Sequence, residues 1–232
     1  DIIQISQNDH AGRCTCKTCL AVEQEEGGVG TASGPLLRFV NQVAEEIEKE
    51  FPRVFVETFA YQYTRKAPAK VRPRANVLIR LCSIECSFLQ PLEGSRENAP
   101  FAGDLAAWGR IAGGNLFGWD YVTSFSSYML SHPNLRVLGP NIRTFVKNGA
   151  TGLFVQGDAL CSAGDFVRLR HWVLSHLLWN PDLDEGRLID TFLCGYYGEK
   201  TGAALKRYLD FVHDRAEHSG VYLGSLASHR SP

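Results

Sequence analysis

Three carboxylates occur where apolar segments of this sequence give way to polar residues. Asp9 follows the short segment DIIQISQN, Glu85 follows the apolar run VLIRLCSI, and Asp120 stands between two aromatic residues. Glycoside hydrolysis uses one carboxylic acid to protonate the leaving oxygen and a second carboxylate as nucleophile or base. We therefore take Asp9 as the candidate acid, and Asp120 or Glu85 as the candidate nucleophile or base.

Aromatic and amide side chains accompany these carboxylates. Sugars are bound by aromatic faces, which cover their C–H surfaces, and by planar polar groups, which hold their hydroxyls. The candidate substrate-binding residues are Asn8, His10, Tyr61, Gln62, Tyr63, Trp119, Tyr121 and Gln156. Together with the carboxylates they predict a site for a glycan.

Each carboxylate also has a structural interpretation. Asp9 would then cap a loop by accepting backbone hydrogen bonds. Asp120 would form a buried ion pair with Arg80 or Arg143, and Glu85 would orient a loop.

The C-x-C-x-x-C pattern is the other concentration of reactive groups. It consists of Cys14, Cys16 and Cys19. The three thiols either supply three corners of a structural zinc site, with His10, Cys82 or Cys86 as the fourth, or form one disulfide and one free thiol. We expect a structural clip for the surrounding loop rather than metal catalysis, and no other cofactor is implied.

The elements that must position these groups alternate along the chain. Strands are predicted at residues 1–6, 54–60, 76–82, 115–121 and 152–156, and helices at 36–51, 101–112, 135–148, 163–179, 184–197 and 201–218. The helix at 36–51 places Phe39, Val40 and Val43 on one apolar stripe. Residues 11–33 are predicted to be a glycine-rich loop.

Strand–helix alternation predicts an α/β fold with a parallel sheet, whose strands carry chemistry at their carboxyl ends. About five such units predict the C-terminal part of a TIM-type (β/α)₈ barrel followed by helices, with the first strands supplied by the same parent chain. The predicted divisions are a partial barrel at 1–179, C-terminal helices at 180–218 and a loose tail at 219–232. A complete doubly wound sheet is the alternative.

Composition excludes two classes of partner. The formal net charge is −1, so there is no basic excess to neutralise the phosphates of a nucleic acid. No apolar stretch reaches the roughly 18 residues of a membrane span. The one basic run extends from Arg65 to Arg74. It is either a solvated connector or a surface that meets an acidic sugar.

Several motifs in order resemble the domain of unknown function 4838 family. They are SQND, C-x-C-x-x-C, LLRFVNQVAEEIEKEFP, ETFAYQYTRKAP, VLIRLCSIECSF, WDYVTSF, NIRTFVKNGATGLFVQGD, LLWNPDLD and FLCGYYG, and they extend from about residue 3 to residue 214. The family is mostly bacterial and is similar to barrels of the α-glucuronidase and hexosaminidase type. The resemblance implies a glycoside-hydrolase-like carbohydrate-active domain and favours an extracytoplasmic or periplasmic location.

Two other classes of function stay open at this point. The first is a carbohydrate-binding module without catalysis. The second is a structural domain that is held together by its cysteines and binds a partner through its polar rim.

Overall fold

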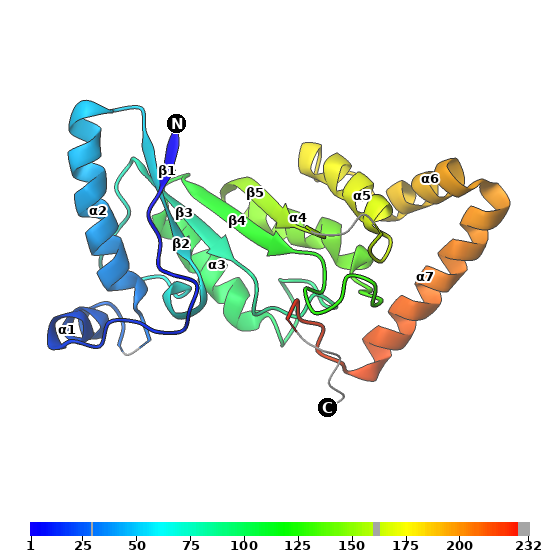
Figure 1. The fold of residues 1–232 in the computed structure, drawn as a ribbon, viewed down its shortest axis with the longest axis horizontal. Helices are drawn as coiled ribbons and strands as arrows, with labels where there is room; N and C mark the ends of the chain where they lie inside the picture. The colour runs from blue at the N-terminus through cyan, green and yellow to red at the C-terminus, as the bar shows by residue number, and fades with distance from the viewer. Residues whose placement is uncertain (29, 160–162, 227–232) are drawn as a thin grey trace. The chain divides into compact units, whose positions relative to one another are not determined.

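The computed structural model describes residues 1–28, 30–159 and 163–226 of the chain. These residues contain the strands β1 (Ile2–Gln4), β2 (Phe55–Ala60), β3 (Val77–Cys82), β4 (Leu116–Tyr121) and β5 (Ala150–Gln156). The helices are α1 (Lys17–Glu25), α2 (Ser33–Glu50), α3 (Ala99–Ile111), α4 (Leu138–Lys147), α5 (Val167–Trp179), α6 (Glu185–Tyr197) and α7 (Glu199–Ser219), with short 3₁₀ turns η1 (Gln62–Thr64) and η2 (Leu135–Val137) (Figure 1). Residues 227–232 of the predicted tail lie outside the described residues.

The five strands form one sheet in the order β1-β2-β3-β4-β5, so neighbours in the sheet are also neighbours along the chain. The strands are parallel, with Glu57 level with Leu78, and Arg80 level with Phe117. The predicted α/β fold with a parallel sheet is confirmed. A doubly wound sheet reverses its strand order at a switch point, whereas a sequential order is that of part of a barrel. The finer assignment to the TIM type stays a prediction.

The chain divides into two compact units that interleave along the sequence. The first consists of Asp1–Ser83, Ala102–Trp119 and Val146–Phe154, and the second of Ile84–Phe101, Asp120–Phe145 and Val155–Pro232. The predicted divisions after residues 179 and 218 stay predictions.

Helix α2 packs on β2 and β3 in the first unit. Its buried face consists of Leu37, Val40 and Ala44, at the three- and four-residue spacing of a helix. Phe39, which the apolar pattern predicts to face inward, is 53 % exposed. Each residue turns the helix by about 100°, so a stripe centred on Leu37 and Val40 leaves Phe39 on the outer side.

Residues 11–33, predicted to be a loop, contain helix α1. Its N-cap is Cys16, whose sulfur accepts a hydrogen bond from the backbone N–H of Cys19 at 3.5 Å. A thiol takes the place of the hydroxyl, amide or carboxylate that usually marks a helix start. The helix also lacks a strong apolar stripe, because its one buried side chain is Glu23. Both facts explain why the apolar pattern does not reveal it.

The second unit contains the predicted C-terminal helices α5, α6 and α7. Helix α5 buries Leu169, Val173 and Leu177 on one face. The guanidinium of Arg170 is also buried, and it donates to Asn134 Oδ1 at 3.1 Å and to the Asp165 carbonyl at 2.6 Å. None of the helices in the described part of the chain is long and apolar enough to cross a membrane.

Candidate functional site

A chain of hydrogen bonds links Asp9 to the end of strand β2. The Tyr61 hydroxyl donates to Asp9 Oδ1 at 3.1 Å and accepts from Gln62 Nε2 at 3.0 Å. Asp9 follows β1, and Tyr61 follows β2, its neighbour in the sheet. The structure thus brings together three residues that the sequence assigns to the site, at the carboxyl ends of two parallel strands.

The turn that carries Tyr61 and Gln62 is held in an unusual conformation. Gln62 has φ of 50°, one of two non-glycine residues with positive φ in the described ranges. Thr64 Oγ1 accepts from the Tyr61 backbone N–H at 3.1 Å, and it donates to Gln7 Oε1 at 3.0 Å. Gln7 Nε2 in turn donates to the Tyr61 carbonyl at 2.8 Å. The left-handed conformation costs about 1–2 kcal/mol in a non-glycine residue, and these contacts hold it in place.

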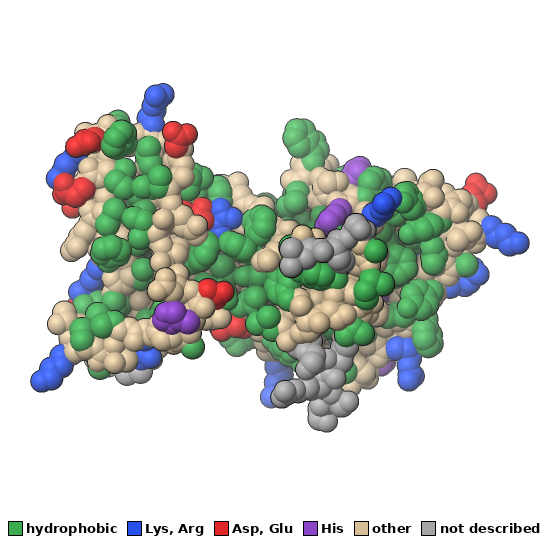
Figure 2. Space-filling view, in the orientation of Figure 1, with side chains coloured by type: hydrophobic (Ala, Val, Ile, Leu, Met, Phe, Trp, Pro, Cys, Tyr) green, Lys and Arg blue, Asp and Glu red, His purple; other side chains and the backbone are tan. Residues whose placement is uncertain are grey.

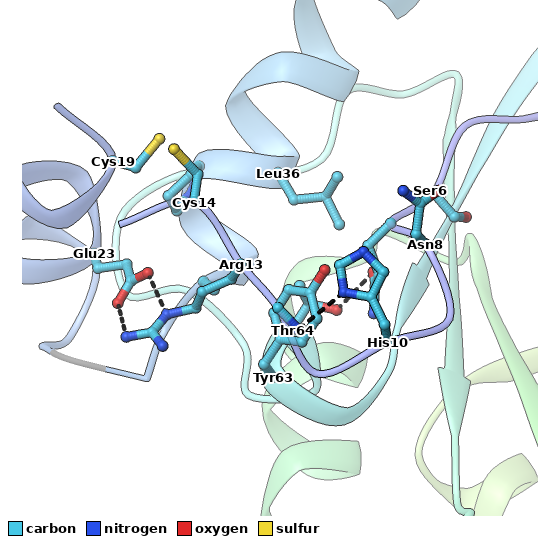
Figure 3. A pocket seen from close by; sticks show the side chains of 14 residues that line it. Ser6, Asn8, His10, Arg13, Cys14, Cys19, Glu23, Leu36, Tyr63 and Thr64 are labelled. Atoms are coloured by element: carbon cyan, nitrogen blue, oxygen red, sulfur yellow. Dashed lines mark hydrogen bonds and ion pairs between the residues drawn. The ribbon is translucent and has the colours of Figure 1, made fainter. Parts of the chain in front are cut away.

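A pocket of about 330 Å³ lies beside this turn and within the first unit. Asn8 and His10 line it from the segment after β1, and Tyr63 and Thr64 line it from the turn after β2 (Figure 3). His10 Nδ1 accepts from the Gly12 N–H at 2.9 Å, which leaves its other ring nitrogen as the one that carries a proton in the neutral ring. Burial raises the pKa of Tyr63, so its hydroxyl keeps its proton. The pocket thus offers amide, imidazole and phenol groups of the kind that bind hydroxyls.

A charged pair that the sequence analysis missed lies on one face of the sheet. Arg80 Nε and Nη2 donate to the two carboxylate oxygens of Glu57 at 2.6 and 2.7 Å. The Arg80 guanidinium also lies 5.6 Å from the ring centroid of Phe117 and 5.9 Å from that of Trp119. Figure 2 shows mainly hydrophobic side chains over the middle of the first unit, with few acidic and basic ones among them. A signal was present in the sequence, because Glu57 and Arg80 each interrupt an otherwise apolar strand.

Trp119 belongs to an aromatic cluster on the same face. Its ring makes edge contacts with Phe59 and Phe154, at centroid distances of 5.4 and 4.7 Å. Trp119 is partly exposed, and Phe154 is 44 % exposed. Aromatic rings in this state are the surfaces on which the apolar face of a sugar ring packs.

Asp120 and Tyr121 lie in the part of β4 that belongs to the second unit, and both are buried. Side chains alternate between the faces of a strand, so Asp120 points to the opposite face from Trp119. The two arginines expected to pair with Asp120 in a structural role each bind another carboxylate. Arg80 pairs with Glu57, and Arg143 pairs with Glu185 at 3.1 Å. The catalytic role of Asp120 stays a prediction.

Glu85 and Gln156 also belong to the second unit. The side chain of Glu85 is exposed, and its backbone carbonyl accepts a hydrogen bond from the Tyr222 hydroxyl. The carbonyl of Gln156 accepts from the Val122 N–H at 3.0 Å, which continues the pairing of β4 and β5. Asp9 lies in the first unit, and the meeting of the three carboxylates in one site stays a prediction.

Two arginines of the basic run between Arg65 and Arg74 form ion pairs with carboxylates of the first unit. Arg65 Nε contacts Asp104 Oδ2 at 2.8 Å, and Arg74 Nη2 contacts Glu48 Oε2 at 2.7 Å. These two arginines therefore link the connector to α3 and α2, and a role of the run in meeting an acidic sugar stays a prediction.

The three clustered cysteines lie at the start of α1. Their sulfur atoms are all within 4.8 Å of one another. Hydrogen bonds from the Cys19 N–H and from the thiols of Cys14 and Cys19 lower the pKa of Cys16 to about 7. A hydrogen bond with the Cys14 thiol is the largest cause that raises the pKa of Cys19 to about 12, and a hydrogen bond with Cys16 is the next. This cluster could hold a metal ion.

These features define an α/β protein with a sequentially ordered parallel sheet and with polar and aromatic residues at its strand ends. The sequence model of the Domain of unknown function (DUF4838) family matches residues 1–210, and the chain belongs to this family. No curated protein matches the chain, and no solved structure does.

Proposed function

We propose that this chain is part of a carbohydrate-active, glycoside-hydrolase-like domain. The observation that carries the proposal is the hydrogen-bonded group of Asp9, Tyr61 and Gln62 at the carboxyl ends of β1 and β2. In parallel α/β folds this edge of the sheet is where ligands bind and react. A carboxylate, a phenol and an amide within one such group match what glycan hydroxyls require.

Asp9 is the proposed acid. Its side chain is exposed, and among the described residues Tyr61 binds only its Oδ1. The Tyr61 hydroxyl therefore fixes the direction of the carboxyl group while Oδ2 stays open to a glycosidic oxygen. Asn8, His10 and Gln62 are the proposed hydroxyl contacts, and an approach of about 3 Å is needed for proton transfer.

The aromatic cluster around Trp119 is the proposed platform for a sugar ring. Arg80 lies over the Trp119 and Phe117 rings, and Glu57 fixes its guanidinium by two bonds. A guanidinium fixed in this way can donate to sugar hydroxyls or to the carboxylate of an acidic sugar. We therefore include acidic glycans among the candidate substrates.

Asp120 or Glu85 is the proposed nucleophile or base, and further strands of a TIM-type barrel are proposed to complete the site. In the described part of the sheet β1 pairs only with β2, and β5 is the opposite edge. Open edges of this kind are what a sheet has when more strands join it. For a two-carboxylate mechanism, the oxygens of the two carboxyl groups must lie within about 10 Å of each other.

The cysteine cluster is proposed to be a structural clip for the loop after β1. The loop carries Asp9 and His10 at one end and Cys14 at the other. The chemistry of the site is assigned to oxygen and nitrogen groups, and the thiols fix the path of the chain.

A carbohydrate-binding module without turnover is the second candidate. It is favoured by the Glu57–Arg80 pair, because two short hydrogen bonds hold the buried Glu57 carboxylate to the guanidinium beside the aromatic rings. A carboxylate paired in this way orients the guanidinium for binding.

The test compares hydrolysis and binding in the full-length protein. We expect turnover of an aryl glycoside or aryl glucuronide, and a reduction of at least about 100-fold in Asp9→Asn, because general acid catalysis contributes roughly 10²–10⁴-fold. Glu50→Gln is the matched control, since Glu50 is an exposed carboxylate at the end of α2. Glycan binding without turnover in the wild type would support the second candidate, and the absence of both binding and turnover would exclude a carbohydrate function.

A further inference from the structure

The segment around α1 contains a preformed arrangement of soft ligands. Cys14, Cys16 and Cys19 place their sulfur atoms within 4.8 Å of one another. Zinc–sulfur bonds are about 2.3 Å long, so tetrahedral geometry separates two zinc-bound sulfurs by about 3.8 Å. Each sulfur therefore needs to move by no more than a side-chain adjustment to reach one corner of a tetrahedron.

We propose that Cys14, Cys16 and Cys19 bind a divalent d¹⁰ cation, Zn²⁺, as three thiolate ligands with the fourth position open. Thiolates select soft and borderline cations over Ca²⁺ and Mg²⁺, which take oxygen ligands. The site is separate from the Asp9–Tyr61–Gln62 group and does not depend on the proposed carbohydrate function.

The backbone around the thiols is fixed by contacts that do not involve sulfur. Arg13 Nε and Nη2 donate to the two carboxylate oxygens of Glu23 at 2.9 and 3.3 Å. Glu23 is only 1 % exposed, and its Oε2 also accepts from the Gly30 N–H at 3.3 Å. Arg13 immediately precedes Cys14, and Glu23 lies on the helix that carries Cys19. The ion pair thus joins the two pieces of chain that supply the ligands, as Figure 3 shows.

The cluster lies at the start of a helix and is accessible from solvent. Cys16 is the N-cap of α1, and its sulfur accepts from the Cys19 N–H. Two of the three thiols are exposed, so an ion can reach them from solvent.

The fourth position has no protein ligand in the described ranges. His10, which lines the same pocket, lies at its far end from Cys14 and Cys19 (Figure 3), and its Nδ1 is taken by the Gly12 N–H. Among the described residues, the cluster of potential ligand atoms consists of the sulfurs of Cys14, Cys16 and Cys19. A water molecule or a small anion from solvent is the expected fourth ligand.

The test measures metal content and coordination in the full-length protein purified under reducing conditions. We expect one zinc ion per chain from elemental analysis that is lost in Cys14→Ser, Cys16→Ser and Cys19→Ser. Substitution with Co²⁺ should produce the near-ultraviolet absorption of thiolate-to-cobalt charge transfer. Changes to residues that only support metal ligands lower metal affinity by roughly 10–100-fold. Each serine variant should lower it by more than this, because a ligand itself is changed.

Cys194→Ser is the matched control, because Cys194 is an exposed cysteine on α6 and lies outside the cluster. It should keep the full metal content. Removal of zinc from the wild type by a chelator should lower Tm reversibly, and this measurement needs no variant that might fail to fold. Equal zinc content in the wild type and Cys16→Ser, or a disulfide among the three cysteines in the reduced preparation, would overturn the proposal.

Discussion

The phenol of Tyr61 is the centre of the candidate site because it connects a carboxylate and an amide from different segments. It donates to Asp9 and accepts from Gln62. The backbone of Gln62 has φ of 50°, although glycine would adopt that conformation without strain. Strain of this kind persists where the surrounding contacts require it, and it occurs often at binding sites. The Gln62 side chain donates to the Tyr61 hydroxyl, and the contacts of Thr64 hold the turn that carries both residues.

Gln62→Gly should separate stability from function. Relief of the left-handed strain should raise the free energy of unfolding by about 1–2 kcal/mol. The greater freedom of glycine in the unfolded chain should lower it by about 0.5–1 kcal/mol. We expect the free energy of unfolding to rise by roughly 0.5 kcal/mol while glycan affinity falls. Urea unfolding and calorimetric titration measure the two quantities, and Gln42→Gly on the exposed face of α2 is the control that should only destabilise. A loss of stability in Gln62→Gly with unchanged glycan affinity would contradict this account.

The residues at strand ends could be predicted, and the pairing of Glu57 with Arg80 could not. Asp9, Tyr61 and Gln62 each follow an apolar segment, and a parallel sheet brings such ends to one edge. Glu57 and Arg80 are 23 positions apart, and their pairing depends on the register of β2 and β3. A single sequence does not specify that register, so neither residue stands out as one of a pair.

At the scale of elements, the buried carboxylate of Glu26 joins three segments of the first unit. Its Oε2 accepts from the N–H groups of Lys70 and Val71 at 2.7 and 2.9 Å, and its Oε1 accepts from Arg38 Nη2 at 2.7 Å. Burial alone would raise the pKa of Glu26. The two N–H groups and the guanidinium outweigh burial and hold the pKa below its ordinary value. Glu26 thus ties the end of α1 to α2 and to the basic connector.

Glu26→Gln should destabilise the protein in a pH-dependent way. A carboxylate with a lowered folded-state pKa contributes stability above its unfolded pKa of about 4.3, and this contribution is lost as the pH falls through the folded value. We expect the free energy of unfolding to be roughly 2 kcal/mol lower in the variant at neutral pH. This difference should shrink as the pH falls below the ordinary pKa of a glutamate. Urea unfolding of the wild type and the variant, from neutral pH to below the ordinary pKa of a glutamate, measures this difference in stability.

Glu25→Gln is the matched control for this experiment. Glu25 contacts the same Arg38 guanidinium at 2.8 Å, but its side chain is 54 % exposed. Exposed ion pairs contribute about 0–1 kcal/mol, so Glu25→Gln should change stability little at any pH. Equal losses in the two variants would show that burial of Glu26 is not the source of the effect.

The helices show where apolar patterning succeeds. Helices α2, α3 and α4 are expected from apolar residues at helical spacing, and α5, α6 and α7 from the breaks at Asn180, Pro181 and Gly198 and from acidic first turns. Helix α1 was missed, since it buries Glu23 and begins at Cys16. A buried polar side chain such as Glu23 needs a partner such as Arg13, and only the folded chain brings the two together.

At the scale of the whole molecule, the described sheet has exposed strands at both edges. Ile2 and Ile3 of β1 are 50 % and 40 % exposed, and Phe154 of β5 is 44 % exposed. Exposed apolar edge strands pair readily with other strands. The edges are where the strands of a larger barrel are proposed to join.

The chain of residues 1–232, produced alone, should therefore associate in a concentration-dependent way. Ile3→Lys places a charge on the β1 edge and should reduce this association, because charged side chains block edge pairing. Phe39→Lys, which removes a 53 % exposed aromatic from α2, is the control and should have less effect. Sedimentation velocity measures the outcome. A monomeric chain at all concentrations, or equal effects of the two lysines, would contradict the edge interpretation.

The central claim is that the group of Asp9, Tyr61 and Gln62 binds a glycan, and calorimetric titration of the full-length protein tests it most directly. The titrants are a panel of neutral and acidic oligosaccharides, each measured with the wild type, with Tyr61→Phe and with Glu50→Gln. The account predicts binding of at least one glycan, an affinity roughly tenfold lower in Tyr61→Phe because the hydroxyl that orients Asp9 and Gln62 is lost, and no change in Glu50→Gln. Binding of no glycan by the wild type, or equal affinity in Tyr61→Phe, would contradict it.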